Sequence, residues 1–238
     1  MMLLLVTSFS LAFGLSVEGG SIMKTTSPVT PVVPNLIANE IDENAMLAAS
    51  SFPIPPEKLI ALCKKVVGEY GIGTKDGGAC LSDSFEFCAA VVGPIGKTEY
   101  LKALENFDLE SAFPDLNPRY YGWRVDCLQP NRVYFMTRTV ATHTASLMGK
   151  KPTGKFLELP PQLFHMDFDA QGKVQEVGFY VVDRRQGNTG GLGGAFGFLY
   201  GVGQPLPIPE CRPYKPSFQF RFFSWLANLA NKFKKKST

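Results

Sequence analysis

The chain contains only two histidines, and both lie in one stretch, THTASLMGKKPTGKFLELPPQLFHMDF, from Thr142 to Phe168. Histidine suits proton transfer near neutral pH, because its ordinary pKa is about 6.5. Two histidines facing one cavity could act as acid and base, whereas a histidine in a tight turn is usually held by hydrogen bonds. His143 lies in the Thr-His-Thr turn where a predicted strand ends. This position favours the hydrogen-bonded role, with a place at a pocket mouth as the alternative.

His165 alternates along its predicted strand with Phe164, Met166 and Phe168. Successive side chains of a strand point to opposite faces, so His165 faces away from these three residues and shares its face with Asp167 and Asp169. If that face lines a pocket, His165 is a candidate catalytic acid or base. If it is the outer face, His165 is a surface residue beside acids. The sequence leaves both alternatives open.

A third candidate for proton transfer is Asp183, which ends the apolar run VGFYVV and is followed by Arg184 and Arg185. It could be a carboxylate with a raised pKa at the base of an apolar cavity. The favoured alternative is an acid paired with one of the two arginines. Side chains on the predicted strands that could bind a substrate are Arg124, Tyr134, Arg138 and Phe179.

Metal and nucleic-acid sites are not expected. The five cysteines, at positions 63, 80, 88, 127 and 211, form no CxxC and no zinc-type spacing with the histidines. They are interpreted as small buried residues, with a Cys80–Cys88 disulfide as the alternative in an oxidising compartment. Seven of the 24 basic residues follow residue 211, so the preceding part holds 17 basic against 21 acidic residues. That acidic body gives no reason to expect a nucleic-acid partner.

The elements that must position these residues follow from periodicity. PPEKLIALCKKVVGEYG (55–71) and GKTEYLKALENF (96–107) place apolar residues at helical spacing. Four runs of strand-forming residues follow, at 119–128, 132–145, 156–168 and 173–183. Helices followed by antiparallel strands predict an α+β fold, with helices on one face of a curved sheet and an apolar pocket between them.

Five motifs occur together and in order: LSDSFEF, GPIGKTEYL, AFPDL, THTASLMGKKPTGK and FHMDFDAQGKVQEV. This set resembles the SnoaL-like branch of the nuclear-transport-factor-2-like superfamily, over roughly Pro55 to Gly194. The resemblance implies a cone-shaped α+β barrel that is often a homodimer through its sheet. Cyclases of this branch use an acid on the last strand and a histidine on the preceding strand. His165 matches that histidine, but GFYVV holds no carboxylate and Asp183 is the nearest acid.

The resemblance implies two functions of different kinds. The first is a cofactor-independent cyclase, isomerase or dehydratase of an apolar carbonyl compound, with His165 and Asp183 as acid and base. His143 is a further candidate near its pocket, and Tyr134 or Arg138 would hold the oxygen. The second is a non-catalytic binder or carrier of an apolar small molecule at a membrane surface. The missing carboxylate favours the second function, and the paired histidines favour the first.

The two ends of the chain differ from its body. Residues 1–12 are typical of a signal peptide, and 13–53 of a flexible leader. A signal followed by Phe13 and a Ser/Thr-rich stretch resembles the two-part plastid leader of algae with red-algal plastids, so a plastid is favoured over secretion. The SnoaL-like domain is expected at 54–200, with a glycine-rich segment at 187–203 interpreted as a packed lid and a plain loop as the alternative. Residues 201–238 form a proline-rich link and a tail, whose segment Phe222–Lys236 could contact a membrane peripherally.

Overall fold

The computed structural model describes residues 37–105 and 107–234. It divides the chain into two units, Met1–Ile41 and Asp42–Thr238, and only residues 37–41 of the first are described. The signal peptide expected at 1–12 and the leader as far as residue 36 lie outside the described residues. The rest of the expected flexible leader differs from the prediction. It contains helix α1 (Glu43–Ala48), and Leu47 and Phe52 pack against the core.

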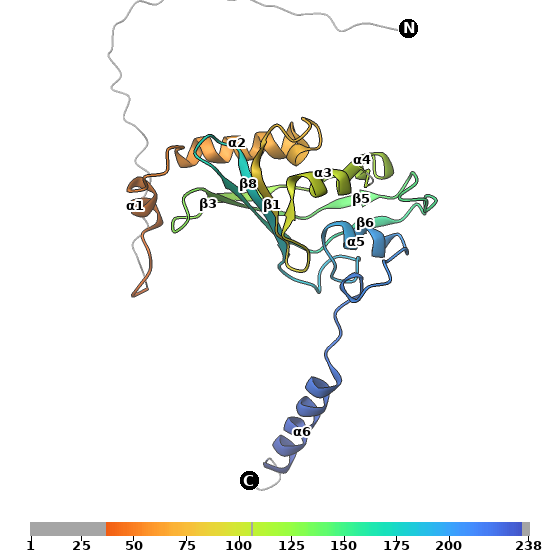
Figure 1. Cartoon of the computed structure of the whole chain (residues 1–238). Coiled ribbons are helices and arrows are strands. Elements are labelled where there is room, and N and C mark those ends of the chain that lie inside the picture. The colour runs from red at the N-terminus through yellow and green to blue at the C-terminus, as the bar shows by residue number, and fades with distance from the viewer. Residues whose placement is uncertain (1–36, 106, 235–238) are drawn as a thin grey trace, which may run out of the picture. The chain divides into compact units, whose positions relative to one another are not determined.

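Helices precede the run of strands, as the sequence predicts (Figure 1). The strands are β1 (Leu81–Phe87), β2 (Ile95–Gly96), β3 (Tyr121–Val125), β4 (Arg132–Thr137), β5 (Val140–Thr142), β6 (Phe156–Glu158), β7 (Gln162–Phe168) and β8 (Val174–Val181). The other helices are α2 (Pro56–Gly68), α3 (Lys97–Glu105), α4 (Leu109–Ala112), α5 (Gly194–Gly201) and α6 (Phe218–Lys234). Short 3-10 turns lie at Gly71–Gly73 and Pro209–Cys211.

Six strands form the main sheet, in the order β2-β1-β8-β7-β4-β3. All neighbours pair antiparallel except β1 and β8, which run parallel. The α+β class with a curved, mainly antiparallel sheet is therefore confirmed, and the parallel pair is the one departure. β1, with the sequence LSDSFEF, is not among the four strand runs that the sequence predicts.

Helix α2 forms where the sequence predicts it. Pro56 occupies its first turn, where a missing N–H costs nothing. Leu59, Cys63 and Val66 recur at helical spacing and are fully buried against the sheet. α2 packs across β3 and β4, and α3 packs against β1, so both helices cover the same side of the sheet as in Figure 1.

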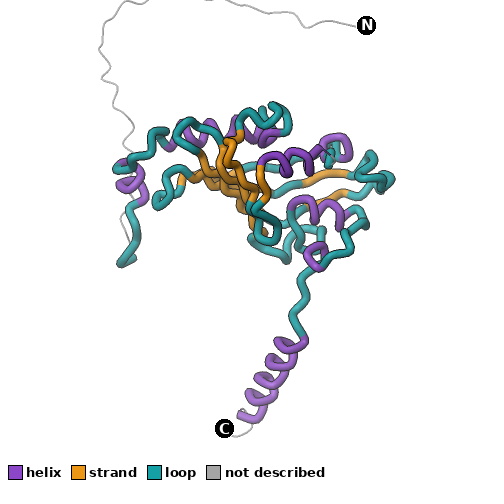
Figure 2. The backbone as a smooth tube through the Cα atoms, in the orientation of Figure 1, coloured by secondary structure: helices purple, strands orange, loops and turns teal. Residues whose placement is uncertain are grey.

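Two of the predicted strand runs are each broken into two strands. The run 132–145 divides into β4 and β5, and the run 156–168 divides into β6 and β7. β4 and β7 belong to the main sheet, whereas β5 and β6 form a separate pair, seen at the edge of the strands in Figure 2. Pro160 and Pro161 interrupt the second run, because proline cannot donate a hydrogen bond to a neighbouring strand. The hairpin therefore bends at this point.

The bend separates two hydrophobic cores. The first lies between α2 and the main sheet and includes Leu59, Phe135 and Met166. The second lies between the β5–β6 pair, α4 and α5 and includes Phe113, Leu157 and Phe198. The two cores lie on either side of the bent hairpin. The space between them is the candidate site.

Candidate functional site

A cavity of about 1560 Å³ lies between the two cores. This volume exceeds the roughly 300–1,000 Å³ of typical small-molecule sites. Both cores contribute to its walls: Val67, Tyr100, Phe135 and Val177 from the first, and Phe113, Leu159 and Phe198 from the second. The expectation of an apolar hollow between sheet and helices is therefore met by the described residues.

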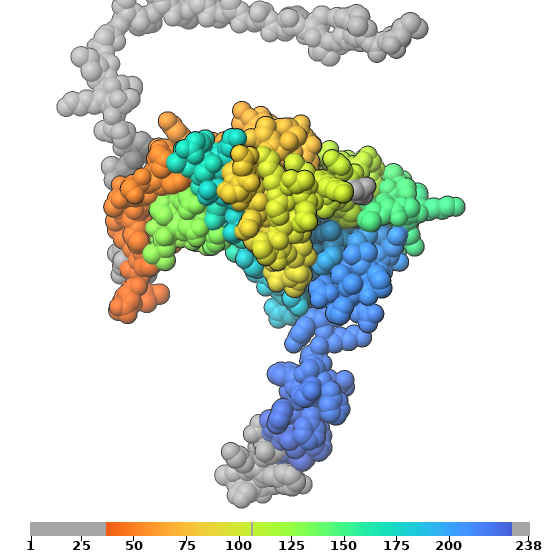
Figure 3. Space-filling view, in the orientation of Figure 1, coloured from red at the N-terminus to blue at the C-terminus, as the bar shows by residue number. Residues whose placement is uncertain are grey.

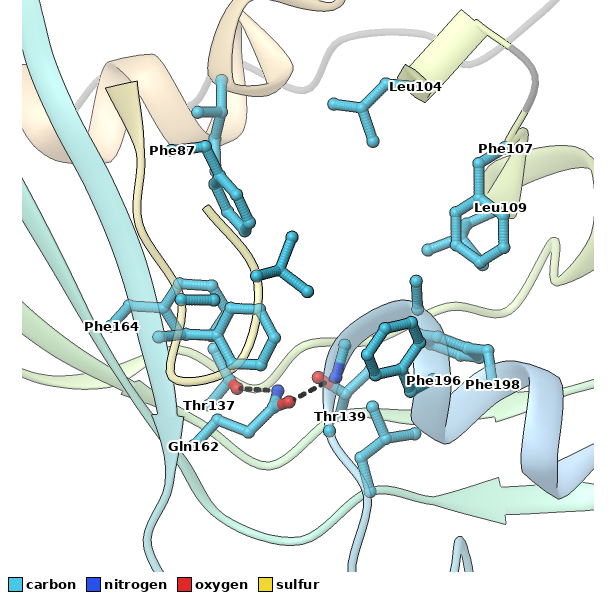
Figure 4. Close-up of a pocket in the computed structure, with 18 of the residues that line it drawn as sticks. Phe87, Leu104, Phe107, Leu109, Thr137, Thr139, Gln162, Phe164, Phe196 and Phe198 are labelled. Atoms are coloured by element: carbon cyan, nitrogen blue, oxygen red, sulfur yellow. Dashed lines mark hydrogen bonds between the residues drawn. The ribbon is translucent and has the colours of Figure 1, made fainter. Parts of the chain in front are cut away.

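The walls of this cavity are mostly aromatic and aliphatic (Figure 4). The sheet supplies Phe87 and Phe164, and the segment from α3 to α4 supplies Leu104, Phe107 and Leu109 from the opposite side. These five side chains are only partly buried, because each packs against one of the two cores and also borders the hollow. They form a surface suited to an apolar guest molecule.

Three polar side chains form one floor of the cavity: Thr137, Thr139 and Gln162. The backbone N–H of Gly194 donates to Gln162 Oε1 at 2.6 Å, and Gln162 Nε2 donates to Thr137 Oγ1 at 3.2 Å. The Gly194 N–H can only donate, so it fixes which end of the amide is the oxygen. Gln162 keeps a second N–H hydrogen, and the Thr139 hydroxyl has no hydrogen-bond partner among the described residues. The floor can therefore donate hydrogen bonds to an oxygen of a bound molecule.

These floor residues lie at the bend of the hairpin. Thr137 ends β4 and pairs with Gln162, which begins β7, and the Thr139 carbonyl accepts from the Leu159 N–H. The sequence analysis missed all three residues. A signal was present, because Gln162 follows two prolines inside an otherwise apolar run and is buried to 2% exposure. A buried amide next to a strand break indicates a group that needs a specific partner.

The glycine-rich segment 187–203 closes the end of the cavity, and Gly193, Gly194 and Phe196 line it. A Cβ on Gly193 would lie 2.1 Å from Gln162 Oε1, and one on Gly201 would lie 2.8 Å from a Leu157 methyl carbon. These glycines let α5 approach the sheet and the β5–β6 pair closely. Figure 3 shows this blue segment against the green hairpin. The segment is packed, as expected, because α5 contributes Phe198 and Leu199 to the second core, and that it acts as a lid stays a prediction.

The structure places His165 on the other face of the sheet. Phe164 lines the cavity, Met166 and Phe168 belong to the first core, and His165 faces away from all three. Its Nε2 lies 2.7 Å from Glu176 Oε1, and its Nδ1 is buried without a partner among the described residues. His165 does not line the cavity. Of the two alternatives from the sequence, the structure favours the outer face, but His165 is 1% exposed there and is not a surface residue.

His165 belongs to a network of charges on that outer face. Arg132 donates to both oxygens of Asp167, at 2.6 and 2.7 Å, and its Nη2 lies 3.2 Å from Glu176 Oε1. The hydrogen bonds from Arg132 to Asp167 raise the pKa of the guanidinium further above its ordinary range. Gln129 also donates to Asp167. The acid and base groups near His165 therefore satisfy one another.

Asp183 is also outside the cavity, and it is paired. Arg185 Nε and Nη2 donate to its two oxygens at 2.9 and 3.1 Å, and Gln186 donates at 3.1 Å. The hydrogen bonds from Arg185 hold the pKa of the Asp183 carboxyl well below its ordinary range. The raised pKa considered from the sequence is thus corrected, because the carboxylate is partnered by a cation and is not surrounded by apolar atoms.

His143 has a structural role in its hairpin. Its side chain is fully buried beside Phe113, and its Nδ1 accepts a hydrogen bond from the Thr153 backbone N–H at 3.2 Å. Burial lowers the pKa of His143, with Lys150 adding to the effect. His143 follows β5, whereas His165 pairs with Tyr134 in the middle of β4. The two histidines therefore do not share a site.

The predicted substrate-binding residues divide in the same way. Phe179 lines the cavity. Tyr134 lies on the outer face opposite His165, and the Arg124 guanidinium lies over its ring, 5.2 Å from the centroid. Arg138 is exposed and donates to the Tyr121 hydroxyl. The structure does not bring these three polar residues to the cavity.

Metal ligands are not grouped among residues 37–105 and 107–234, where no set of three His, Cys, Asp or Glu side chains could hold an ion. The five cysteines are free, with Cys63 and Cys211 buried. Four acids border the cavity, Glu105, Asp108, Glu110 and Glu210, and all are exposed at its rim.

No protein-family model and no curated protein sequence matches this chain. Among solved structures, AclR of Streptomyces galilaeus, a proposed hydroxylase, is 19% identical with a TM-score of 0.46, covering 76% of this chain and 97% of its own. A proposed SnoaL-like polyketide cyclase from Jannaschia is 16% identical with a TM-score of 0.42, covering 55% and 88%. IdmH of Streptomyces antibioticus, a proposed polyketide cyclase, is 15% identical with a TM-score of 0.41, covering 52% and 91%.

Proposed function

We propose that this protein binds an apolar small molecule with an oxygen-bearing end in the cavity between its two cores. The observation that carries the proposal is the combination of largely apolar walls with two buried donors, Thr139 and Gln162, at the floor. A few placed polar groups in an apolar pocket orient a ligand without charge. A carbonyl or hydroxyl oxygen at the floor would accept from the free N–H of Gln162 or the Thr139 hydroxyl.

Binding is proposed in preference to proton transfer because of where the titratable groups lie. His165 and Asp183, the acid and base expected of a cyclase, are each engaged by a partner outside the cavity. The described walls hold no histidine, and the acids among them are at the exposed rim. A general acid or base must be within hydrogen-bond reach of the proton that it moves.

The test is a titration with phenylnaphthylamine, an apolar dye that fluoresces when it leaves water. Leu104→Arg places a charge on the cavity wall, whereas Glu99→Arg places the same side chain on the exposed side of the same helix. We expect Leu104→Arg to weaken dye binding about tenfold or more, since apolar contact is replaced by a group that must stay hydrated. Glu99→Arg should bind like the wild type.

Two results would refute the proposal: saturable binding that is unaffected by Leu104→Arg, or no saturable binding by a wild-type chain that is folded. Circular dichroism of both variants separates loss of the site from loss of the fold. His165→Asn and Asp183→Asn should bind the dye as the wild type does, because neither side chain lines the cavity.

A further inference from the structure

Helix α6 presents a row of large apolar side chains that the rest of the described chain leaves exposed. Phe218, Phe222 and Trp225 are 77%, 46% and 57% exposed, and Leu226 and Leu229 are 39% and 37% exposed. Folded proteins rarely expose so many large apolar residues on one short element unless another surface covers them.

These residues lie on one side of the helix. The aromatic rings of Phe218 and Phe222 are 6.4 Å apart, and those of Phe222 and Trp225 are 6.1 Å apart. Spacings of three and four residues continue this row through Leu226 and Leu229, and together they form a stripe about 100° wide. On an ideal helix Phe220, Phe223 and Ala227 lie on the opposite side together with Ser224, whereas Arg221 and Asn228 flank the stripe. We call the five apolar residues Phe218, Phe222, Trp225, Leu226 and Leu229 the α6 stripe.

The charge of the same segment is entirely positive. From Arg212 to the end the sequence has seven Lys or Arg residues and no acid, and KFKKK at 232–236 follows the stripe directly. None of the described helices is long and apolar enough to cross a membrane. A partner for this segment must therefore have a negatively charged surface with an apolar layer directly beneath it.

We propose that α6 docks this protein on an anionic lipid bilayer, lying in the plane of the membrane with the α6 stripe in the acyl region. Aromatic side chains enter the boundary between headgroups and acyl chains, while lysines remain at the level of the anionic headgroups. An anionic bilayer supplies both the apolar layer and the negative charge. This proposal is independent of the cavity, which is built from other residues.

The test is flotation of the full chain with vesicles of phosphatidylcholine, alone or with phosphatidylserine. We expect binding to the mixed vesicles at 0.1 M salt and much weaker binding at 1 M salt, since the screening length falls from about 10 Å to about 3 Å. Lys234→Gln, Lys235→Gln and Lys236→Gln combined should reduce partitioning by a factor on the order of 100, at roughly fivefold per cation.

Two double variants distinguish membrane binding through the α6 stripe from nonspecific hydrophobic adsorption. Phe222→Ser with Trp225→Ser removes two rings from the α6 stripe and should lower partitioning about tenfold or more. Phe220→Ser with Phe223→Ser removes two exposed rings that lie outside the stripe, and it should have a clearly smaller effect. Both variants should retain phenylnaphthylamine binding in the cavity.

Three results of the vesicle assay would overturn the docking proposal: no binding to mixed vesicles, equal binding to neutral vesicles at both salt concentrations, or equal losses in the two double variants. Sedimentation of the chain without lipid measures self-association, which would make a second copy of the chain the partner of the α6 stripe. Self-association that depends on the stripe, with no vesicle binding, would also overturn it. Loss of dye binding with vesicle binding intact would refute the cavity proposal alone.

Discussion

The two faces of β7 show how differently neighbouring residues of one strand can be used. On the outer face, His165 and Asp167 are tied to Glu176 and Arg132. On the inner face, Gln162 and Phe164 border the cavity. The side-chain amide of Gln162 is the polar group at the start of β7, where the hairpin bends. The ionisable residues that attract notice in the sequence are engaged with one another on the outer face, although His165 Nδ1 is buried without a partner among the described residues. The inner face has less conspicuous chemistry but more unused bonding capacity, and it is the face with space for a ligand.

The largest effect is expected from disrupting the ion pair between Arg132 and Asp167 on the outer face. Arg132→Met leaves Asp167, whose side chain is 9% exposed, without its cation. Removing one partner of a nearly buried pair is costly, so the free energy of unfolding should fall by about 3 kcal/mol. Urea denaturation measures this change.

The control for Arg132→Met is Arg185→Met, which breaks the exposed pair with Asp183. Its unfolding midpoint should match the wild type, because exposed ion pairs contribute little. Equal midpoints for the two variants would show that the outer-face network is no more stabilising than a surface pair. Dye binding should survive in both.

A smaller effect on stability is expected from a substitution on the inner face. Gln162→Leu keeps the approximate size of the side chain but leaves the Gly194 N–H without its acceptor. Loss of that bond should cost about 1–3 kcal/mol in the free energy of unfolding. The variant should also lose preference for probes that carry a carbonyl over matched hydrocarbons, as measured by competition with the dye.

Gln129→Leu is the matched change on the outer face, where Asp167 retains both bonds from Arg132. It should cost less stability than Gln162→Leu and leave probe preference unaltered. If Gln129→Leu altered preference as much as Gln162→Leu, the floor would not be the group that orients ligands.

The smallest effect concerns pH. Burial lowers the pKa of His143 in the folded protein, so the unfolded chain takes up its proton first as pH falls. Stability from this group is present above about pH 6.5 and is lost below it, at no more than about 1.4 kcal/mol per pH unit. His143→Gln should therefore show a shallower decline of unfolding free energy between pH 7.5 and pH 5.5. A slope as steep as that of the wild type would contradict this role.

Much of the fold could be predicted because it depends on local periodicity. The helical spacing of Leu59, Cys63 and Val66 requires one buried face, and the structure provides it. The alternation of Phe164, Met166 and Phe168 similarly requires one face turned to the interior. The parallel pairing of β1 with β8 could not be predicted, because it joins segments that are far apart in sequence.

The site was harder to predict for a related reason. Alternation says which residues share a face, but it does not say which face encloses a hollow, so His165 was equally suited to either role. The bend that creates the cavity depends on Pro160 and Pro161, which lie inside a run that otherwise resembles one strand. A polar residue immediately after such a break, as at Gln162, is the feature that marks the site.

The most direct test of the central claim is to locate bound phenylnaphthylamine by nuclear Overhauser effects to methyl-labelled leucines. The cavity account predicts contacts to Leu104 and Leu109, together with a shift of the Gly194 amide resonance. Contacts confined to Leu226 and Leu229 of α6, or to Leu163 on the outer face, would contradict it.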